Sequence, residues 1–253
     1  MRKKVFQWLG REFVSLSAEG RTAKSAADEA RDLFQRLDDE LKGLGLSLDN
    51  TVRTRLWGRD RENRDHGSAE RVKILSGKAR SASSSFISPV HFDSDARVAI
   101  DLLAMRPANA HAQKQLKEYE PPITPLRYLI YDSVVFLSGV TAVLPTLEDQ
   151  MVDILPRIEG SLKDAGGSWD RAVKASFLLH RSQKFDTLKG LFQKQVKANI
   201  PQMEYFHVDG YSSEGKLIDS PLLLPGIFGY FIPNGGKIHC SAETSRRGNL
   251  ASD

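Results

Sequence analysis

The chain contains an internal repeat. The segment from Leu33 to Trp57 returns 121 positions later as the segment from Ile154 to Leu178. The matched positions are Arg36 and Arg157, Leu41-Lys42 and Leu162-Lys163, Gly45 and Gly166, Ser47 and Ser168, Asp49 and Asp170, Val52 and Val173, and, further upstream, Ser17 and Ser138. Helix periodicity alone rarely keeps apolar and turn positions in one register. The sequence therefore predicts two copies of one unit of about 110 residues.

Length and composition limit the class of protein. A chain of 253 residues can form two domains of ordinary size. The net charge is +4, but basic residues alternate with acidic ones, as in 53–65, which is typical of a solvated surface. We therefore expect no nucleic-acid partner. The apolar runs are too short to cross a bilayer, so we expect a cytoplasmic protein with no membrane partner. The spacing of its His, Asp, Glu and Cys residues matches no metal site, and we expect neither a metal nor a cofactor.

Each unit alternates strand-like and helical segments. In the first unit, strand patterns cover 12–17, 51–57, 80–88 and 96–105, and a helix begins after Ser25 and ends at Gly43 and Gly45. Residues 59–78 are polar and poorly patterned, with room for a short helix. The second unit has strand patterns at 133–138, 172–179 and 204–208 and helical patterns at 147–163 and 185–197. The Pro- and Gly-rich stretch past Ser220 has no copy in the first unit.

These patterns predict a fold class and a domain division. We expect an α+β fold in which each unit has a mixed β-sheet with helices packed on one face. The other face of each sheet must also be covered, so we expect the units to pair in a larger assembly. The predicted division is a first domain at 1–107, a linker at 108–125, a second domain at 126–225 and a C-terminal extension at 226–253, whose end we expect to be disordered.

Several motifs occur in the same order in both units. The second unit has Phe136-Leu-Ser-Gly139, Ala165-Gly-Gly-Ser-Trp-Asp-Arg-Ala-Val-Lys174 and Phe185-Asp-Thr-Leu before a final strand. The first has Leu44-Gly-Leu-Ser-Leu-Asp-Asn-Thr-Val52, Lys78-Ala-Arg-Ser81 and Arg97-Val-Ala-Ile-Asp101. Over about 200 residues this order resembles the Rid family (YjgF, reactive-intermediate deaminases), in a tandem two-unit form.

The resemblance implies a fold, an assembly and a chemistry. It implies two chorismate-mutase-like units and a trimer whose ligand sites lie in clefts between units. Typical members hydrolyse enamines and imines, such as 2-aminoacrylate, to keto acids and ammonia without a metal or organic cofactor. For a tandem chain we expect a homo-oligomer, either a pseudo-symmetric trimer or a pseudo-hexameric arrangement.

The resemblance also implies site residues. An arginine that holds the substrate carboxylate falls at Arg80, and a guanidinium can bind a carboxylate through two parallel hydrogen bonds. The matching position in the second unit is Met203. We expect the opposite wall of the cleft to come from Ser138 and Gly139, because a glycine lets the backbone approach a ligand closely. Ser81 and Tyr128 complete the predicted substrate-binding set.

The sequence departs from the family pattern at the acidic position. The acidic residue with which typical members position water would fall near Ala99 in the first unit and near Leu217 in the second. Glu19 and Ser83 are the predicted catalytic substitutes beside Arg80, and His91, Asp93 and Glu204 are further candidates.

The leading functional prediction is a hydrolase or deaminase that acts on a C–N bond (imine, enamine or amide) of a small carboxylated metabolite. A non-catalytic sensor or small-molecule-binding protein is the alternative, favoured by the loss of both expected acidic residues. A chorismatase-like enzyme and an RNA-binding protein are further alternatives.

Overall fold

The computed structural model describes residues 1–225, and the predicted C-terminal extension, 226–253, lies outside the described residues. The first half forms a five-stranded sheet in the order β1-β2-β5-β3-β4. Its elements are β1 (Arg2–Trp8), β2 (Arg11–Glu19), α1 (Ala26–Gly43), β3 (Thr51–Gly58), α2 (Arg61–Ile74), β4 (Ala82–Ile87) and β5 (Val98–Arg106).

The second half repeats this arrangement. Its sheet has the order β10-β9-β12-β8-β7-β6, and β11 also pairs with β9. Its elements are β6 (Gln115–Lys117), β7 (Tyr128–Tyr131), β8 (Val134–Leu137), α3 (Leu147–Asp164), β9 (Lys174–His180), α4 (Phe185–Gln195), β10 (Gln202–Val208), β11 (Ile218–Asp219) and β12 (Leu222–Pro225). The order β7-β8-β12-β9-β10 matches β1-β2-β5-β3-β4 strand for strand. The predicted α+β class, with two repeated mixed sheets and helices on one face of each, is confirmed.

The helix ends show why the two halves fold alike. The hydroxyl of Ser25 accepts a hydrogen bond from the backbone N–H of Asp28 at 3.1 Å, and this N-cap begins α1. Thr146 caps α3 in the same way, through Asp149. After each helix a glycine turns the chain in the left-handed region, with φ +68° at Gly45 and φ +71° at the repeat-equivalent Gly166.

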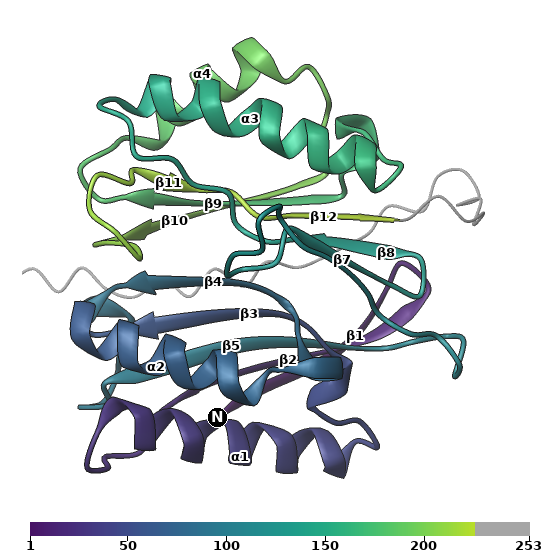
Figure 1. Cartoon of the computed structure of the whole chain (residues 1–253), viewed down its shortest axis with the longest axis vertical. Coiled ribbons are helices and arrows are strands. Elements are labelled where there is room, and N and C mark those ends of the chain that lie inside the picture. Colours follow the sequence, from purple (N-terminus) through teal and green to yellow (C-terminus); the bar gives the residue numbers. More distant parts are fainter. Residues whose placement is uncertain (226–253) are drawn as a thin grey trace, which may run out of the picture.

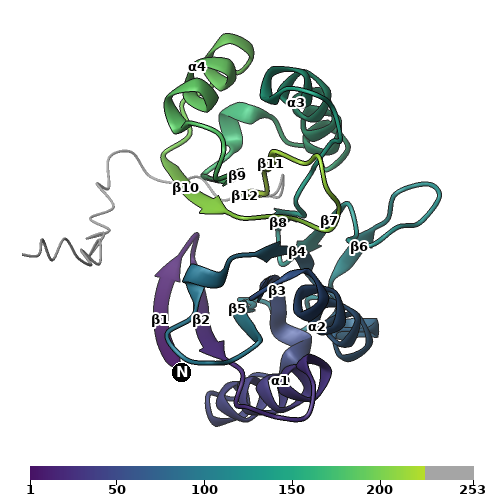
Figure 2. The same ribbon diagram turned by 90° about the vertical axis from the view of Figure 1, so that its left-hand side faces the viewer.

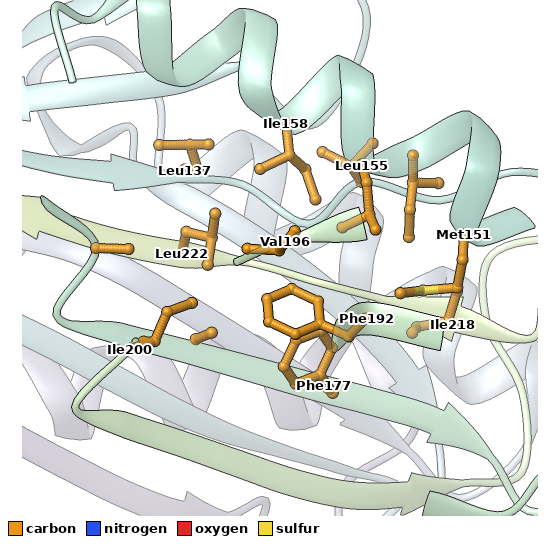
Figure 3. Packing of buried hydrophobic residues seen from close by; sticks show 14 of the residues in the cluster. Leu137, Met151, Leu155, Ile158, Phe177, Phe192, Val196, Ile200, Ile218 and Leu222 are labelled. Carbon is orange, nitrogen blue, oxygen red and sulfur yellow. The ribbon is translucent and has the colours of Figure 1, made fainter. Parts of the chain in front are cut away.

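Each helical pair packs on its own sheet through a separate apolar core. In the second half, α3 and α4 bury a continuous cluster against β9 and β12 that includes Ile158, Phe177 and Phe192 (Figure 3). Ile200, just before β10, belongs to this cluster and is 5% exposed. In the first half, Leu33, Phe34 and Leu37 on α1 pack on β2 and β5. Burial of these faces orients each sheet with its helix-free face toward the other half.

The two sheets meet through their helix-free faces. Figure 1 shows four layers, with α3 and α4, the second sheet, the first sheet, and α1 and α2 stacked in that order, and Figure 2 shows the same stacking from the side. Phe13 and Phe136 pack across the boundary with their rings 6.4 Å apart. Repeat-equivalent positions also meet there, because Arg55 donates to the Ser176 hydroxyl at 2.8 Å. The buried Arg11 forms an ion pair with Asp132, also at 2.8 Å.

Some sequence expectations need correction. The segment 2–8, to which the sequence patterns assign no element, is the edge strand β1, whose basic side chains are exposed. The predicted linker contains β6, which pairs with β7. The described start of the stretch past Ser220, β12, does have a counterpart in the first half, because β12 pairs with β8 and β9 as β5 pairs with β2 and β3. The domain boundaries themselves stay a prediction.

The polar stretch 59–78 contains a helix of 14 residues, α2, which is longer than the sequence indicates. Its buried residues are Arg64, Gly67, Glu70 and Arg71, so its sequence lacks the apolar residues at helical spacing that would indicate a buried face. The helix lies very close to β3 at Gly58, where a Cβ atom would be 2.4 Å from the Cα atom of Arg64. This contact positions two buried arginines of α2 beside β4.

None of the helices within residues 1–225 combines the length and the apolar character that crossing a membrane requires.

Candidate functional site

Two adjoining cavities lie where the first half meets the second. Chamber 1, of about 280 Å³, is lined by residues that include Thr54, Arg71, Leu75, Arg80, Ser81 and Leu126. Chamber 2, of about 220 Å³, is lined by residues that include Arg64, Arg71, Ser84, Gly139, Arg157 and Asp219. Arg71, Ser83, Thr124 and Pro125 line both chambers. The two chambers are therefore parts of one cleft, and residues of both halves form its walls.

Two arginines of α2 line this cleft, Arg71 in both chambers and Arg64 in chamber 2. Arg64 and Arg71 are seven positions apart, or two helical turns, and so lie on one face of the helix. Arg64 donates to the hydroxyl of Ser85, and Arg71 donates to the backbone carbonyl of Ser84 at 2.6 Å. These bonds to β4 fix both guanidinium groups next to the serine run 83–85.

Arg71 is a buried cation whose charge is not compensated within the described part of the chain. It is 4% exposed, and its hydrogen bonds go to Ser84 and to the hydroxyl of Ser68, with no carboxylate partner among the described residues. Burial, together with the nearby Arg64, lowers the pKa of Arg71 to about 9. An uncompensated buried charge is costly, and an anionic ligand would relieve that cost.

Asp219, on β11, supplies the only carboxylate among the described residues that line chamber 2. It is 4% exposed, and its Oδ1 atom has no hydrogen-bond partner. Burial raises the pKa of Asp219 to about 6, against the opposing influence of Ser84, Arg53 and Lys216. A carboxyl group with this pKa can hold or release a proton near neutral pH, which is what acid–base catalysis requires.

Strand pairing assigns Asp219 to the acidic position that the family resemblance implies. Ala99 pairs with Trp57 on β3, and Asp219 pairs with Leu178 on β9. Trp57 and Leu178 are repeat equivalents, 121 positions apart. Asp219 is therefore the second-half counterpart of Ala99, and the placement of this position near Leu217 was wrong by two residues. The same reasoning applies to Arg80. Ala82 pairs with Arg53, and Gln202 pairs with its repeat equivalent Lys174. The residues two positions earlier, Arg80 and Ile200, are therefore counterparts, and the assignment of Met203 was wrong.

Gly139 makes room for Asp219. A Cβ atom built on Gly139 would lie 1.9 Å from Oδ1 of Asp219, far inside any allowed contact. From the sequence we expect a ligand to approach Gly139, but in the structure the carboxylate of Asp219 takes the space beside it. The preceding residue, Ser138, is 1% exposed, and its hydroxyl accepts a hydrogen bond from the backbone N–H of Ser83 at 3.3 Å. Gly139 thus lines chamber 2, whereas Ser138 contacts β4 and lines neither chamber.

Arg80 lines chamber 1, but its guanidinium already holds a carboxylate. Both of its terminal nitrogens bond to Glu118, one of them at 3.1 Å. Lys114, on the same connecting segment, donates to the carbonyls of Thr51, Lys78 and Arg80 at 2.5, 2.9 and 3.1 Å. Burial lowers the pKa of Lys114 to about 7. The segment predicted to be a linker therefore fixes the Arg80 loop from two sides.

The other predicted site residues divide between the cleft and more distant places. Ser81 lines chamber 1, and Ser83 lines both chambers. Glu19 is outside the cleft, where it accepts hydrogen bonds from the backbone N–H groups of Asp93 and Ser94. Tyr128 lines neither chamber, and its hydroxyl donates to Asp164 at 2.9 Å. The remaining candidates are also elsewhere, since His91 stacks on Trp57 and Glu204 accepts from Lys174 and Ser176.

Sequence reasoning missed Arg64, Arg71 and Asp219. The repeat could have indicated Asp219. If the second half is aligned to the first with one residue deleted after the second helix of the unit, Asp219 falls on Ala99. The arginines of α2 gave no such signal, because charged residues at helical spacing normally indicate a solvent-exposed face, and nothing in the sequence shows that these ones are buried. No group of three or more His, Cys, Asp or Glu side chains within residues 1–225 is arranged to hold a metal ion.

Comparisons with known proteins agree with this architecture. No protein-family model matches the sequence, and no curated protein matches it. A crystal structure of chorismatase superposes with a TM-score of 0.61 at 13% identity, covering 87% of this chain and 79% of that one. A YjgF/YER057c/UK114 family member from Mycobacterium tuberculosis (16% identity) and the Rid protein YyfA from Yersinia pestis (17%) each cover 45% of this chain and 99% of their own, with TM-scores of 0.41. The protein therefore has the two-unit, chorismate-mutase-like α+β fold of chorismatase, with structural neighbours among the Rid/YjgF proteins.

Proposed function

We propose that the cleft is the active site of a hydrolase that acts on a C–N bond, in an imine or enamine, of a small carboxylated metabolite. One observation carries the proposal. A buried, protonatable carboxyl, Asp219, shares a cavity with four cations. Arg64 and Arg157 are paired with Asp65 and Asp153, whereas Arg71 and Lys216 have no ion-pair partner among the described residues. These two cations favour an anionic substrate, and the carboxyl supplies a proton donor beside it.

Acid-first hydrolysis fits these groups. Asp219 in its protonated form gives its proton to the electron-rich carbon of an enamine, which becomes an iminium ion. Water then adds to the iminium carbon, and the Asp219 carboxylate takes a proton from that water. Asp219 then donates this proton to the nitrogen of the resulting carbinolamine, the C–N bond breaks, and the hydroxyl proton returns to Asp219 as the carbonyl forms, so one water is consumed and one ammonia and one keto acid are released. A positioned general acid contributes about a hundredfold to ten-thousandfold to such a rate.

Ser84 is well placed to assist. Its buried hydroxyl lies close enough to Asp219 to lower the pKa of that carboxyl, and it has no other hydrogen-bond partner. An unsatisfied hydroxyl in a polar cavity favours a bound water. We assign to Ser84 the positioning of the attacking water.

A chorismatase-like reaction is the second candidate. The protein shares its fold with chorismatase over most of both chains. An enol ether, like an enamine, is hydrolysed after protonation of an electron-rich carbon, and Asp219 could supply that proton. The assay must therefore offer both substrate types.

The experiment measures ammonia and keto acid released from enzymatically generated 2-aminoacrylate and related imines, and pyruvate released from chorismate. Wild-type protein is compared with Asp219→Asn and with the control Asp101→Asn. Asp101 is a partly buried carboxylate of β5 that accepts hydrogen bonds from Ser17 and Trp57 and lines neither chamber.

Turnover that falls by about a hundredfold or more in Asp219→Asn, but not in Asp101→Asn, would support the proposal. Equal turnover in the two variants would overturn the role of Asp219. Binding of small carboxylates without any turnover would overturn the proposal of an enzyme and favour a non-catalytic sensor or small-molecule-binding protein.

A further inference from the structure

Chamber 1 has polar groups that the proposed reaction does not use. The hydroxyls of Thr54 and Ser81 are buried, and neither has a hydrogen-bond partner. Thr54 is 0% and Ser81 is 7% exposed, and both residues line chamber 1. Buried hydroxyls without partners are rare in folded proteins, because each costs the hydrogen bonds that water would have made. A ligand that accepts hydrogen bonds from both hydroxyls would remove that cost.

The charge in chamber 1 favours an anion. Arg80 is neutralised by Glu118, so the cation available there is the buried Arg71. A single guanidinium with two hydroxyl donors matches the one charge and the two oxygens of a carboxylate.

The other residues that line chamber 1 are the apolar Val72, Leu75, Pro125 and Leu126 and the polar Ser76, Ser83 and Thr124. The apolar residues favour a ligand that is hydrocarbon between its polar ends. Arg71 and Ser83 line both chambers, so a ligand in chamber 1 continues into chamber 2 without leaving the cleft.

We propose that the ligand is a dicarboxylate: one carboxylate and the reacting bond lie in chamber 2 beside Asp219, and a second carboxylate, on a short hydrocarbon arm, lies in chamber 1 on Thr54, Ser81 and Arg71. The proposal deepens the proposed function and rests on it for the reacting end. It assigns chamber 1 as the part of the site that selects the substrate.

The test is a calorimetric binding series and needs no turnover. The probes are the dicarboxylates malonate, succinate, glutarate and adipate, the monocarboxylates acetate, propionate and butyrate, and inorganic phosphate. The variants are Thr54→Val and Ser81→Ala, which remove the two unpartnered hydroxyls at nearly constant volume. The matched controls are Thr51→Val and Ser220→Ala, whose hydroxyls are also buried without partners but line neither chamber.

We expect at least one dicarboxylate to bind more tightly than every monocarboxylate. Its dissociation constant should rise by about tenfold in Thr54→Val and in Ser81→Ala, whereas monocarboxylate binding and both control variants stay unchanged. Dicarboxylates that bind no better than monocarboxylates, equal losses in variants and controls, or tighter binding of phosphate than of any carboxylate would each overturn the proposal. Loss of turnover in Asp219→Asn tests the reaction separately, so either proposal can fail while the other stands.

Discussion

The two halves have the same strand order and helix caps, but they differ at three equivalent positions, each of which lines the cleft in one half only. The first half has Arg80, Ala99 and Ala18, and their counterparts in the second half are Ile200, Asp219 and Gly139. The first half thus keeps the arginine without the acid, and the second keeps the acid without the arginine.

The comparison of the two halves also explains why the second half has a glycine, Gly139, where the first has an alanine. In the first half Ala18 pairs with Ile100 on β5, and the counterpart of Asp219 is the small Ala99, so no carboxylate lies there for the methyl group of Ala18 to meet. In the second half the acid needs the space that a methyl group would fill, and the position is Gly139. Acid and glycine therefore belong together as a pair, and the predictions below test this pair and then the arginine.

The largest expected change in stability comes from Asp219→Asn. The pKa of Asp219 rises from 3.8 to about 6 on folding, so the folded state binds its proton more tightly than the unfolded state does. The free energy of unfolding then falls by about 3 kcal/mol as the pH rises from about 4 to about 6, and it stays at this lower value at higher pH. Asn cannot ionise. We expect Asp219→Asn to be more stable than wild type at pH 8, by up to about 3 kcal/mol, with the difference disappearing near pH 4.

Urea unfolding of both proteins at the two pH values measures this difference. A variant that is less stable than wild type at pH 8 would show that the carboxylate is satisfied in the folded state, contrary to the account.

The second prediction concerns Gly139→Ala. The added methyl group collides with Asp219, and we expect a loss of about 1–3 kcal/mol in the free energy of unfolding together with displacement of the carboxylate. The reverse change in the first half, Ala18→Gly, should cost only about 1 kcal/mol.

A double-mutant cycle sharpens this prediction. In an Asp219→Ala background the collision partner is gone, so Gly139→Ala should cost much less than it does in the wild type. Equal costs in the two backgrounds would mean that the methyl group meets something other than the carboxylate.

The smallest effect is expected for Glu118→Gln. Arg80 and Glu118 have side chains 34% and 31% exposed, so solvent screens their ion pair and its loss should cost less than about 1 kcal/mol. Thermal unfolding measures the cost, with Glu159→Gln as the control, because Glu159 pairs with Lys163 on the surface of α3. A loss several times larger than in the control would show that this pair holds the connecting segment in place.

The elements that depend on local signals could be predicted from the sequence. The caps, the left-handed glycines and the apolar faces of α1 and α3 are local, and the repeat made each visible twice. The strand β1 and the helix α2 could not be read in this way, because an edge strand carries exposed charges and α2 buries charges instead of apolar side chains.

The site was harder to predict than the fold. Ser83, a predicted catalytic residue, and Ser138, a predicted residue of the cleft wall, meet across the boundary. Asp219 needed the pairing of β9 and β11, which is set by tertiary structure, and a shift of two residues hid it. The partner of Arg80 could not be predicted either, because Glu118 lies 38 positions away on a segment that reads as a linker.

The central claim is that Asp219 is the proton donor of a reaction in the cleft, and the pH dependence of kcat/KM tests it most directly. With the best substrate found, the account predicts that kcat/KM of the wild type falls as the pH rises through about 6, because the donor is lost. The residual activity of Asp219→Asn should lack this fall. A wild-type profile that is flat through this range, or the same profile in both proteins, would contradict the account.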